Sequence, residues 1–166
     1  EVRYRWWVWL SLLATAVLGT TTYGMTMGLL GGTRDILAKG LVCTLAAGLA
    51  WTVSLPTLYI LNSLSGSRLS ASSTLLAALV TVSWGGLAMI ASIPINWFFT
   101  TAVPDSGFVL SVNLVVFTGV GVSMVDVFRR VIERLEPDRT VTPTWWLVLV
   151  GTVGAELFWS FGLFQF

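Results

Sequence analysis

Five long apolar stretches constrain the fold of this chain more than any other feature. Each holds about 20 or more residues with few charges, and roughly 20 residues of α-helix cross the hydrocarbon core of a bilayer. The short connections between them force neighbouring helices to run antiparallel. The sequence therefore predicts a single all-α domain, 1–166, that forms a bundle of about five transmembrane helices at 6–30, 37–61, 74–99, 108–128 and 145–164.

The composition argues against an ordinary water-soluble domain. Hydrophobic residues make up 55% of the chain and charged residues only 10%, whereas a soluble domain carries about 25% charged residues. The net charge of +1 supplies no basic field that would attract nucleic acid. We therefore expect the partners to be the lipid bilayer and other membrane protein subunits or further copies of this chain, with no nucleic acid.

The distribution of Lys and Arg predicts the orientation. Two of the nine, Arg34 and Lys39, fall on one side of the predicted bundle. The other seven fall on the opposite side: Arg3, Arg5, Arg68, Arg129, Arg130, Arg134 and Arg139. Because basic residues are retained on the cytoplasmic side, we expect the N-terminus in the cytoplasm and the C-terminus outside.

Residues that commonly carry catalysis are scarce. The chain has no histidine and a single cysteine, Cys43. This excludes HExxH zinc sites, Ser–His and Cys–His pairs and thiolate clusters, and no nucleotide-binding glycine motif is present. We therefore predict a protein that is not an enzyme and that has no cofactor and no metal site. A lipid-modifying enzyme would need a second acid near Glu156.

Glu156 is the polar residue that most needs explaining. It lies eleven residues after Trp145, about 16 Å into the predicted last helix. A charge at that depth is costly, so the carboxyl group must be protonated, paired or hydrogen-bonded. Thr152 and Ser160, four residues away on either side, share its helix face. These three residues form either a proton or ion site, a polar contact to a partner subunit, or a bond to another helix of the same chain.

Small residues recur at spacings that favour close helix packing. The pattern is typical of membrane helices whose backbones approach one another. The predicted packing positions are Gly24, Gly28, Gly40, Gly48, Gly151 and Ala155. The pattern does not distinguish contacts within the chain from contacts to another protein.

Other polar and aromatic residues have simpler interpretations. Near predicted helix ends, where water or caps can satisfy them, lie Asn62, Asn96 and Asn113. Three of the nine tryptophans fall deeper and are expected to pack between helices, namely Trp51, Trp84 and Trp159. A predicted cytoplasmic contact for a partner or acidic lipid headgroups comprises Arg129, Arg130, Arg134 and Arg139. The simpler interpretation of the same stretch is a solvated helix extension, with Asp126 paired locally to Arg129 or Arg130, and the contact is its functional alternative.

Three stretches, at 22–32, 54–70 and 145–159, read TYGMTMGLLGG, SLPTLYILNSLSGSRLS and WWLVLVGTVGAELFW. Together they resemble an uncharacterised family of small bacterial five-helix membrane proteins, loosely similar in architecture to the Yip1 domain. The resemblance implies a multi-pass protein of the bacterial inner (cytoplasmic) membrane with no known activity. It also implies that Gln is usual where Glu156 stands, which disfavours a proton-carrying role.

These observations predict a non-enzymatic integral membrane protein that serves as a structural or accessory subunit of a larger membrane complex. Small size, helix faces rich in small residues and missing catalytic groups support this hypothesis. The alternative is a small transporter or channel that acts as a homo-oligomer, with Glu156 in an intramembrane polar path.

Overall fold

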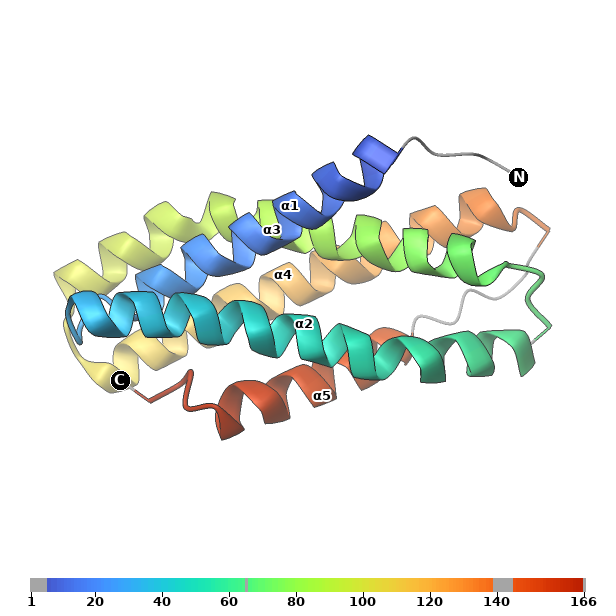
Figure 1. Cartoon of the computed structure of the whole chain (residues 1–166). Helices are drawn as coiled ribbons and strands as arrows, with labels where there is room; N and C mark the ends of the chain where they lie inside the picture. Colours follow the sequence, from blue (N-terminus) through green and yellow to red (C-terminus); the bar gives the residue numbers. More distant parts are fainter. Residues whose placement is uncertain (1–5, 65, 139–144, 166) are drawn as a thin grey trace.

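The computed structural model describes residues 6–64, 66–138 and 145–165, and within them it is entirely α-helical. Figure 1 shows the five helices as a bundle in which successive helices run in opposite directions. Their bounds are α1 Trp6–Met27, α2 Thr33–Leu64, α3 Ala71–Ala102, α4 Ser106–Leu135 and α5 Trp145–Ser160. The prediction of a helical bundle is therefore confirmed.

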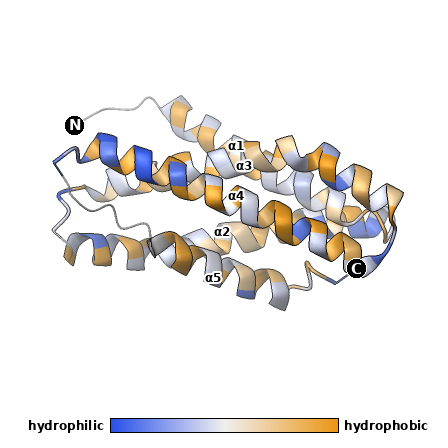
Figure 2. Cartoon of the chain, turned by 180° about the vertical axis from the view of Figure 1, so that it is seen from behind, coloured by the Kyte–Doolittle hydropathy of each residue, from blue (hydrophilic) through white to orange (hydrophobic). Residues whose placement is uncertain are grey.

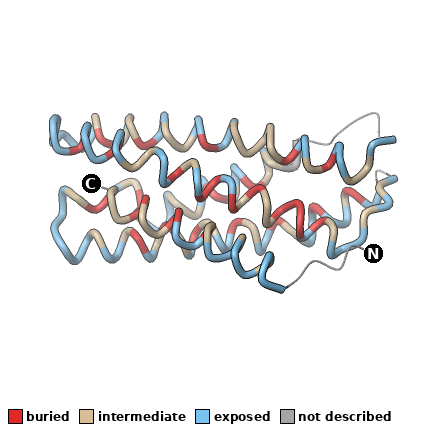
Figure 3. Tube along the Cα trace, turned by 90° about the horizontal axis from the view of Figure 1, so that it is seen from above, coloured by how far each residue is buried: buried red, intermediate tan, exposed pale blue. Residues whose placement is uncertain are grey.

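The helices are joined in a branched arrangement. α1 packs against both α2 and α3, whereas α2 and α3 scarcely touch each other. α4 packs on α3, and α5 packs on α2. Buried residues accordingly follow the inward faces between these pairs (Figure 3). α4 and α5 are thus the outer members of the bundle, each attached through a different inner helix.

Four helices, α1 to α4, are long and apolar enough to cross a membrane. Figure 2 shows hydrophobic residues along their length and a hydrophilic stretch at the end of α4. Large apolar side chains face outward, such as Val115 and Val122, which are 72% and 67% exposed. This is the pattern of a multi-pass membrane protein, because lipid tails can cover such a surface and water cannot do so without cost. The fifth helix, α5, has only 16 residues.

The end of α5 differs from the prediction for a physical reason. Gly162 adopts a positive φ of 69°, which L-residues with a Cβ avoid. The amide of Leu163 donates to the Phe158 carbonyl and the amide of Gly162 to the Trp159 carbonyl, at 2.9 and 3.0 Å. These two bonds form a Schellman motif, with Leu163 buried against Phe158. The helix therefore stops at Ser160, four residues before the predicted end, and the chain continues without helical structure toward Lys39.

The charged stretch after the fourth apolar segment continues α4, in agreement with its interpretation as a helix extension. α4 runs to Leu135, seven residues past the predicted end. Glu136 caps it and binds the α2–α3 connection: its carboxylate accepts from the Ser67 hydroxyl at 2.9 Å and from the Arg68 amide at 2.7 Å. The end of α4 and the α2–α3 connection are thereby fixed together.

Backbone contacts through glycine hold α1 against its neighbours. A Cβ on Gly19 would collide with the backbone of Gly86 on α3, and one on Gly86 would lie 2.7 Å from the Thr15 carbonyl oxygen. On the other side, a Cβ on Gly24 would lie 2.6 Å from Cβ of Cys43 on α2. Such approach distances are possible only where a side chain is missing.

We expect Gly19→Leu to destabilise the bundle by about 3 kcal/mol or more. This is the upper end of the cost of overpacking a core, because the new side chain would collide with the backbone of α3, which cannot move aside as a side chain can. Thermal unfolding of the purified protein in mild detergent measures the loss. Gly119→Leu is the matched control, since a Cβ there meets no atom within 4 Å. Equal melting temperatures for the two variants would contradict the α1–α3 contact.

We expect Glu136→Ala to loosen the α2–α3 connection and to raise the rate of tryptic cleavage after Arg68 about tenfold, since charge-assisted bonds of this kind contribute roughly 1–3 kcal/mol. Limited proteolysis in detergent is the measurement. Glu133→Ala is the control, because Glu133 pairs with Arg129 on an exposed helix surface, where such pairs contribute about 0.3–0.5 kcal/mol. Similar cleavage rates in both variants would exclude the proposed clamp.

Candidate functional site

The outward face of α5 is the candidate functional site, and its depth follows from its contact with α2. A Cβ on Gly154 would lie 3.7 Å from Cβ of Ala50. Ala50 is about 25 Å along the helix from Thr33 and about 21 Å from Leu64, so the contact lies near the middle of α2. Glu156, two residues further along α5, therefore also lies close to mid-depth of the bundle.

Glu156 points away from the bundle. The structure places Thr152, Glu156 and Ser160 together on the exposed face of α5. The Thr152 hydroxyl donates to the Val148 carbonyl of its own helix at 2.8 Å. Glu156 makes no hydrogen bond or ion pair with any residue that the structure describes. The described part of the chain therefore does not supply the bond to another helix that was one interpretation of this acid.

Small residues surround the acid on the same face. Gly151 and Ala155 are exposed, and a Cβ on Gly151 would meet no atom within 4 Å. Val148 and Trp159 border them and are 68% and 69% exposed. The face therefore combines room for a closely approaching helix with polar groups that such a helix could bind.

The remaining predicted packing glycines divide into two groups. Gly24, Gly28 and Gly40 lie at close approaches between α1 and α2, where a Cβ would meet atoms of the other helix within 3 Å. Gly48 is exposed on α2, and a Cβ there would meet nothing within 4 Å. Gly48 thus resembles Gly151 in being open to a neighbour outside the chain.

The predicted cytoplasmic contact is an exposed, internally paired helix end. Arg130 bonds Asp126 at 2.9 Å and Arg129 approaches Glu133 at 3.4 Å, both at i,i+4 spacing. The local pairing of Asp126 with Arg130 is confirmed. Arg134 is exposed, and Arg139 lies outside the described residues. Exposed pairs of this kind contribute little stability and leave the guanidinium groups accessible to headgroups.

Asn62 lies near the end of α2 as expected and donates to the Ser67 hydroxyl at 3.0 Å, whereas Asn96 and Asn113 bond to another helix inside the bundle. Asn113 accepts a hydrogen bond from the Tyr23 hydroxyl at 2.8 Å, and Asn96 donates to the Thr26 hydroxyl at 2.7 Å. Both asparagines are fully buried. These bonds join α1 to α3 and to α4, so the expectation of satisfaction by water or caps was wrong for them. An amide side chain inside a predicted membrane segment is the sequence signal that could have indicated an interhelical bond, although it does not name the partner.

Two of the three deep tryptophans also differ from expectation. Trp51 is half-buried and packs, as expected, against an apolar cluster that includes Leu58 of α2 and Val150 of α5. Trp84 and Trp159 are 45% and 69% exposed and face outward instead of packing between helices. The indole N–H of Trp84 donates to the Ser123 hydroxyl of α4 at 3.3 Å. An indole can face lipid where its polar atom finds such a partner.

Comparisons with known proteins do not assign the chain to a family. No family model, curated protein or solved structure matches the chain. The resemblance to a family of small bacterial membrane proteins therefore stays a prediction. Within the described residues no cluster of three or more Cys, Asp or Glu side chains forms a site for a metal ion.

We expect Tyr23→Phe to reduce the stability of the bundle by about 0.6–2 kcal/mol, because it leaves the buried Asn113 carbonyl oxygen without its donor. Unfolding by a graded denaturing detergent measures the change. Tyr59→Phe is the control, since Tyr59 is partly exposed on α2 and its hydroxyl has no partner among the described residues. A larger effect at Tyr59 than at Tyr23 would refute the interhelical bond.

Proposed function

We propose that this protein is a non-enzymatic integral membrane protein that serves as a structural or accessory subunit of a larger membrane complex, bound through the outward face of α5. The observation that carries the proposal is Glu156, which is exposed near mid-depth without a partner in the described part of the chain. A carboxyl group facing lipid at the bilayer centre costs about 2.5–3.5 kcal/mol on insertion scales. Association with a second protein removes this cost.

The proposed topology places α5 as the fifth membrane segment. Its contact at Ala50 and the bond from the Lys39 ammonium to the Gln165 carbonyl align residues 145–165 antiparallel to α2. The sixteen residues of α5 rise about 24 Å. Residues 161–165 continue toward Lys39, so the segment approaches the roughly 30 Å thickness of a hydrocarbon core. The clustering of Arg68, Arg129 and Arg130 at one end of the bundle supports an N-terminus in the cytoplasm of a bacterial inner membrane.

The partner is expected to present a helix with matching chemistry. Gly151 and Ala155 admit another backbone at close range, and such contacts are strongest between helices with small residues. A hydrogen-bonding side chain at the depth of Glu156, such as an amide or hydroxyl, would satisfy the carboxyl group. A second copy of this chain is the alternative. In that case Glu156 would line the interface of a homo-oligomer, as a transporter or channel requires.

A photoreactive benzophenone side chain at position 155, in the native host membrane, tests the proposal. We expect an adduct with another membrane protein, and none from the same group at Val115 on the exposed face of α4. Glu156→Leu should reduce the adduct about tenfold, since loss of a buried polar contact costs roughly 1–2 kcal/mol. Glu156→Gln should retain it, because an amide still forms hydrogen bonds.

The outcomes separate the alternatives. An adduct only with a second copy of the chain would replace the subunit proposal with a homo-oligomer. Labelling at Val115 as strong as at Ala155, or no adduct at either, would show that the α5 face is not a docking surface.

A further inference from the structure

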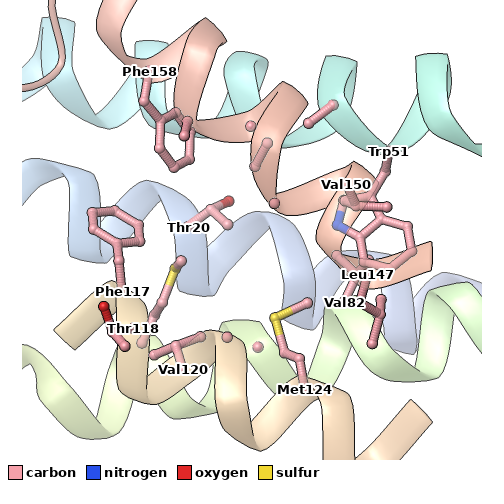
Figure 4. A pocket seen from close by; sticks show the side chains of 18 of the residues that line it. Thr20, Trp51, Val82, Phe117, Thr118, Val120, Met124, Leu147, Val150 and Phe158 are labelled. Atoms are coloured by element: carbon pink, nitrogen blue, oxygen red, sulfur yellow. The ribbon is translucent and has the colours of Figure 1, made fainter. Parts of the chain in front are cut away.

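An internal cavity of about 350 Å³ lies between α2, α3, α4 and α5. Figure 4 shows Phe117 and Phe158 at one end, Trp51, Val82 and Leu147 at the other, and Met124 along one side. Its volume lies in the range of ligand pockets, about 300–1,000 Å³. The side chains that pack between the helices leave this space unfilled, and the proposed contact on the α5 face gives it no role.

The lining offers almost nothing to water. Only Thr20, Thr118 and Trp51 contribute side chains with a polar atom. The Thr20 hydroxyl already donates to the Ala16 carbonyl at 2.9 Å, and the Thr118 hydroxyl to the Leu114 carbonyl at 2.8 Å. A retained water needs about two to four polar partners. An empty cavity, in turn, costs free energy in proportion to its volume, so an apolar occupant is favoured.

The shape of the cavity suits a chain rather than a helix. Along α4 its lining extends from Leu114 to Met124, about 15 Å at helical rise. This volume, spread over that length, makes the cavity narrow and elongated, so that it suits an extended chain of methylenes rather than a helix about 10 Å across.

The cavity opens sideways between α4 and α5. Their backbones have few close contacts. Side chains bring the two helices together at two places: Phe117 lies 5.2 Å from Phe158 between ring centroids, and Phe128 and Val150 belong to one apolar cluster. Gly121 of α4 and Gly151 of α5 both line the cavity and are exposed. The opening therefore has a glycine on each side. It lies near the middle of the helices, where the hydrocarbon tails of the lipids would surround the protein.

We propose that this cavity is a binding site for one acyl chain of a membrane phospholipid, which reaches it laterally between α4 and α5. The flexible side chains of Met89 and Met124 line the site and can adapt to the chain. A partner's helix is too wide for the cavity. The proposal is independent of whether the α5 face binds another protein.

The test uses the full-length chain, purified in mild detergent from vesicles of phosphatidylethanolamine and phosphatidylglycerol, with bound lipid counted by native mass spectrometry. We expect one phospholipid per chain to survive washing. Gly121→Leu, which projects a side chain into the cavity, should reduce occupancy at least fivefold. Gly119→Leu should leave it unchanged, because Gly119 has the same open surroundings but does not line the cavity.

Thermal unfolding of both variants checks that each is folded. Should Gly121→Leu fail to fold, Gly151→Leu fills the cavity from the opposite side, where a Cβ also meets no atom within 4 Å. Equal retention in the filled and control variants would overturn the proposal, as would an absence of retained lipid. Retention of an isoprenoid or pigment carried over from the expression host, in place of a vesicle phospholipid, would overturn the choice of ligand.

Discussion

The backbone contact of α1 with α3 is the constraint on which the rest of the structure depends. Gly19 and Gly86 bring these helices together, while Gly24 and Gly28 bring α2 against the other side of α1. Held by the same helix, α2 and α3 stay apart from each other. Because α5 packs mainly on α2 and α4 mainly on α3, the backbones of the two outer helices have few close contacts with each other. The lateral opening and the uncovered face of α5 both follow from this branching.

Hydropathy was sufficient to predict that five helices exist, but not how each is rotated. Their surfaces are apolar almost all round, so the sequence gives little indication of the face that points inward. This explains why Trp84 and Trp159 were expected inside and lie outside. Gly162 did carry a readable signal, because a glycine after an apolar helix marks a C-terminal cap. The pairing of Tyr23 with Asn113, 90 residues apart, depends on tertiary packing that local pattern does not contain.

The sequence predicted which residues form the candidate site, but not whether they face the bundle or its surroundings. The i,i+4 spacing was enough to put Thr152, Glu156 and Ser160 on one face. Whether that face met the chain's own helices depended on the position of α5, which contacts α2 through the opposite side at Gly154. A membrane offers no water to a polar group, so groups within it must pair. The Asn113 carbonyl oxygen and the Asn96 amide nitrogen do so across helices, although Oδ1 of Asn96 is buried without a partner among the described residues. Glu156 has no partner among the described residues.

The two proposed sites share residues, and this has a thermodynamic consequence. Gly151 and Ala155 belong both to the outward face of α5 and to the lining of the cavity. A helix docked on that face would cover one side of the lateral opening. If both proposals hold, lipid and partner influence each other's affinity, and by linkage the effect is equal in both directions. A lipid that must leave through the opening would be trapped by the partner, while a chain protruding from it would compete with the docking helix. The sign of the coupling therefore depends on how far the bound chain extends past Gly121 and Gly151.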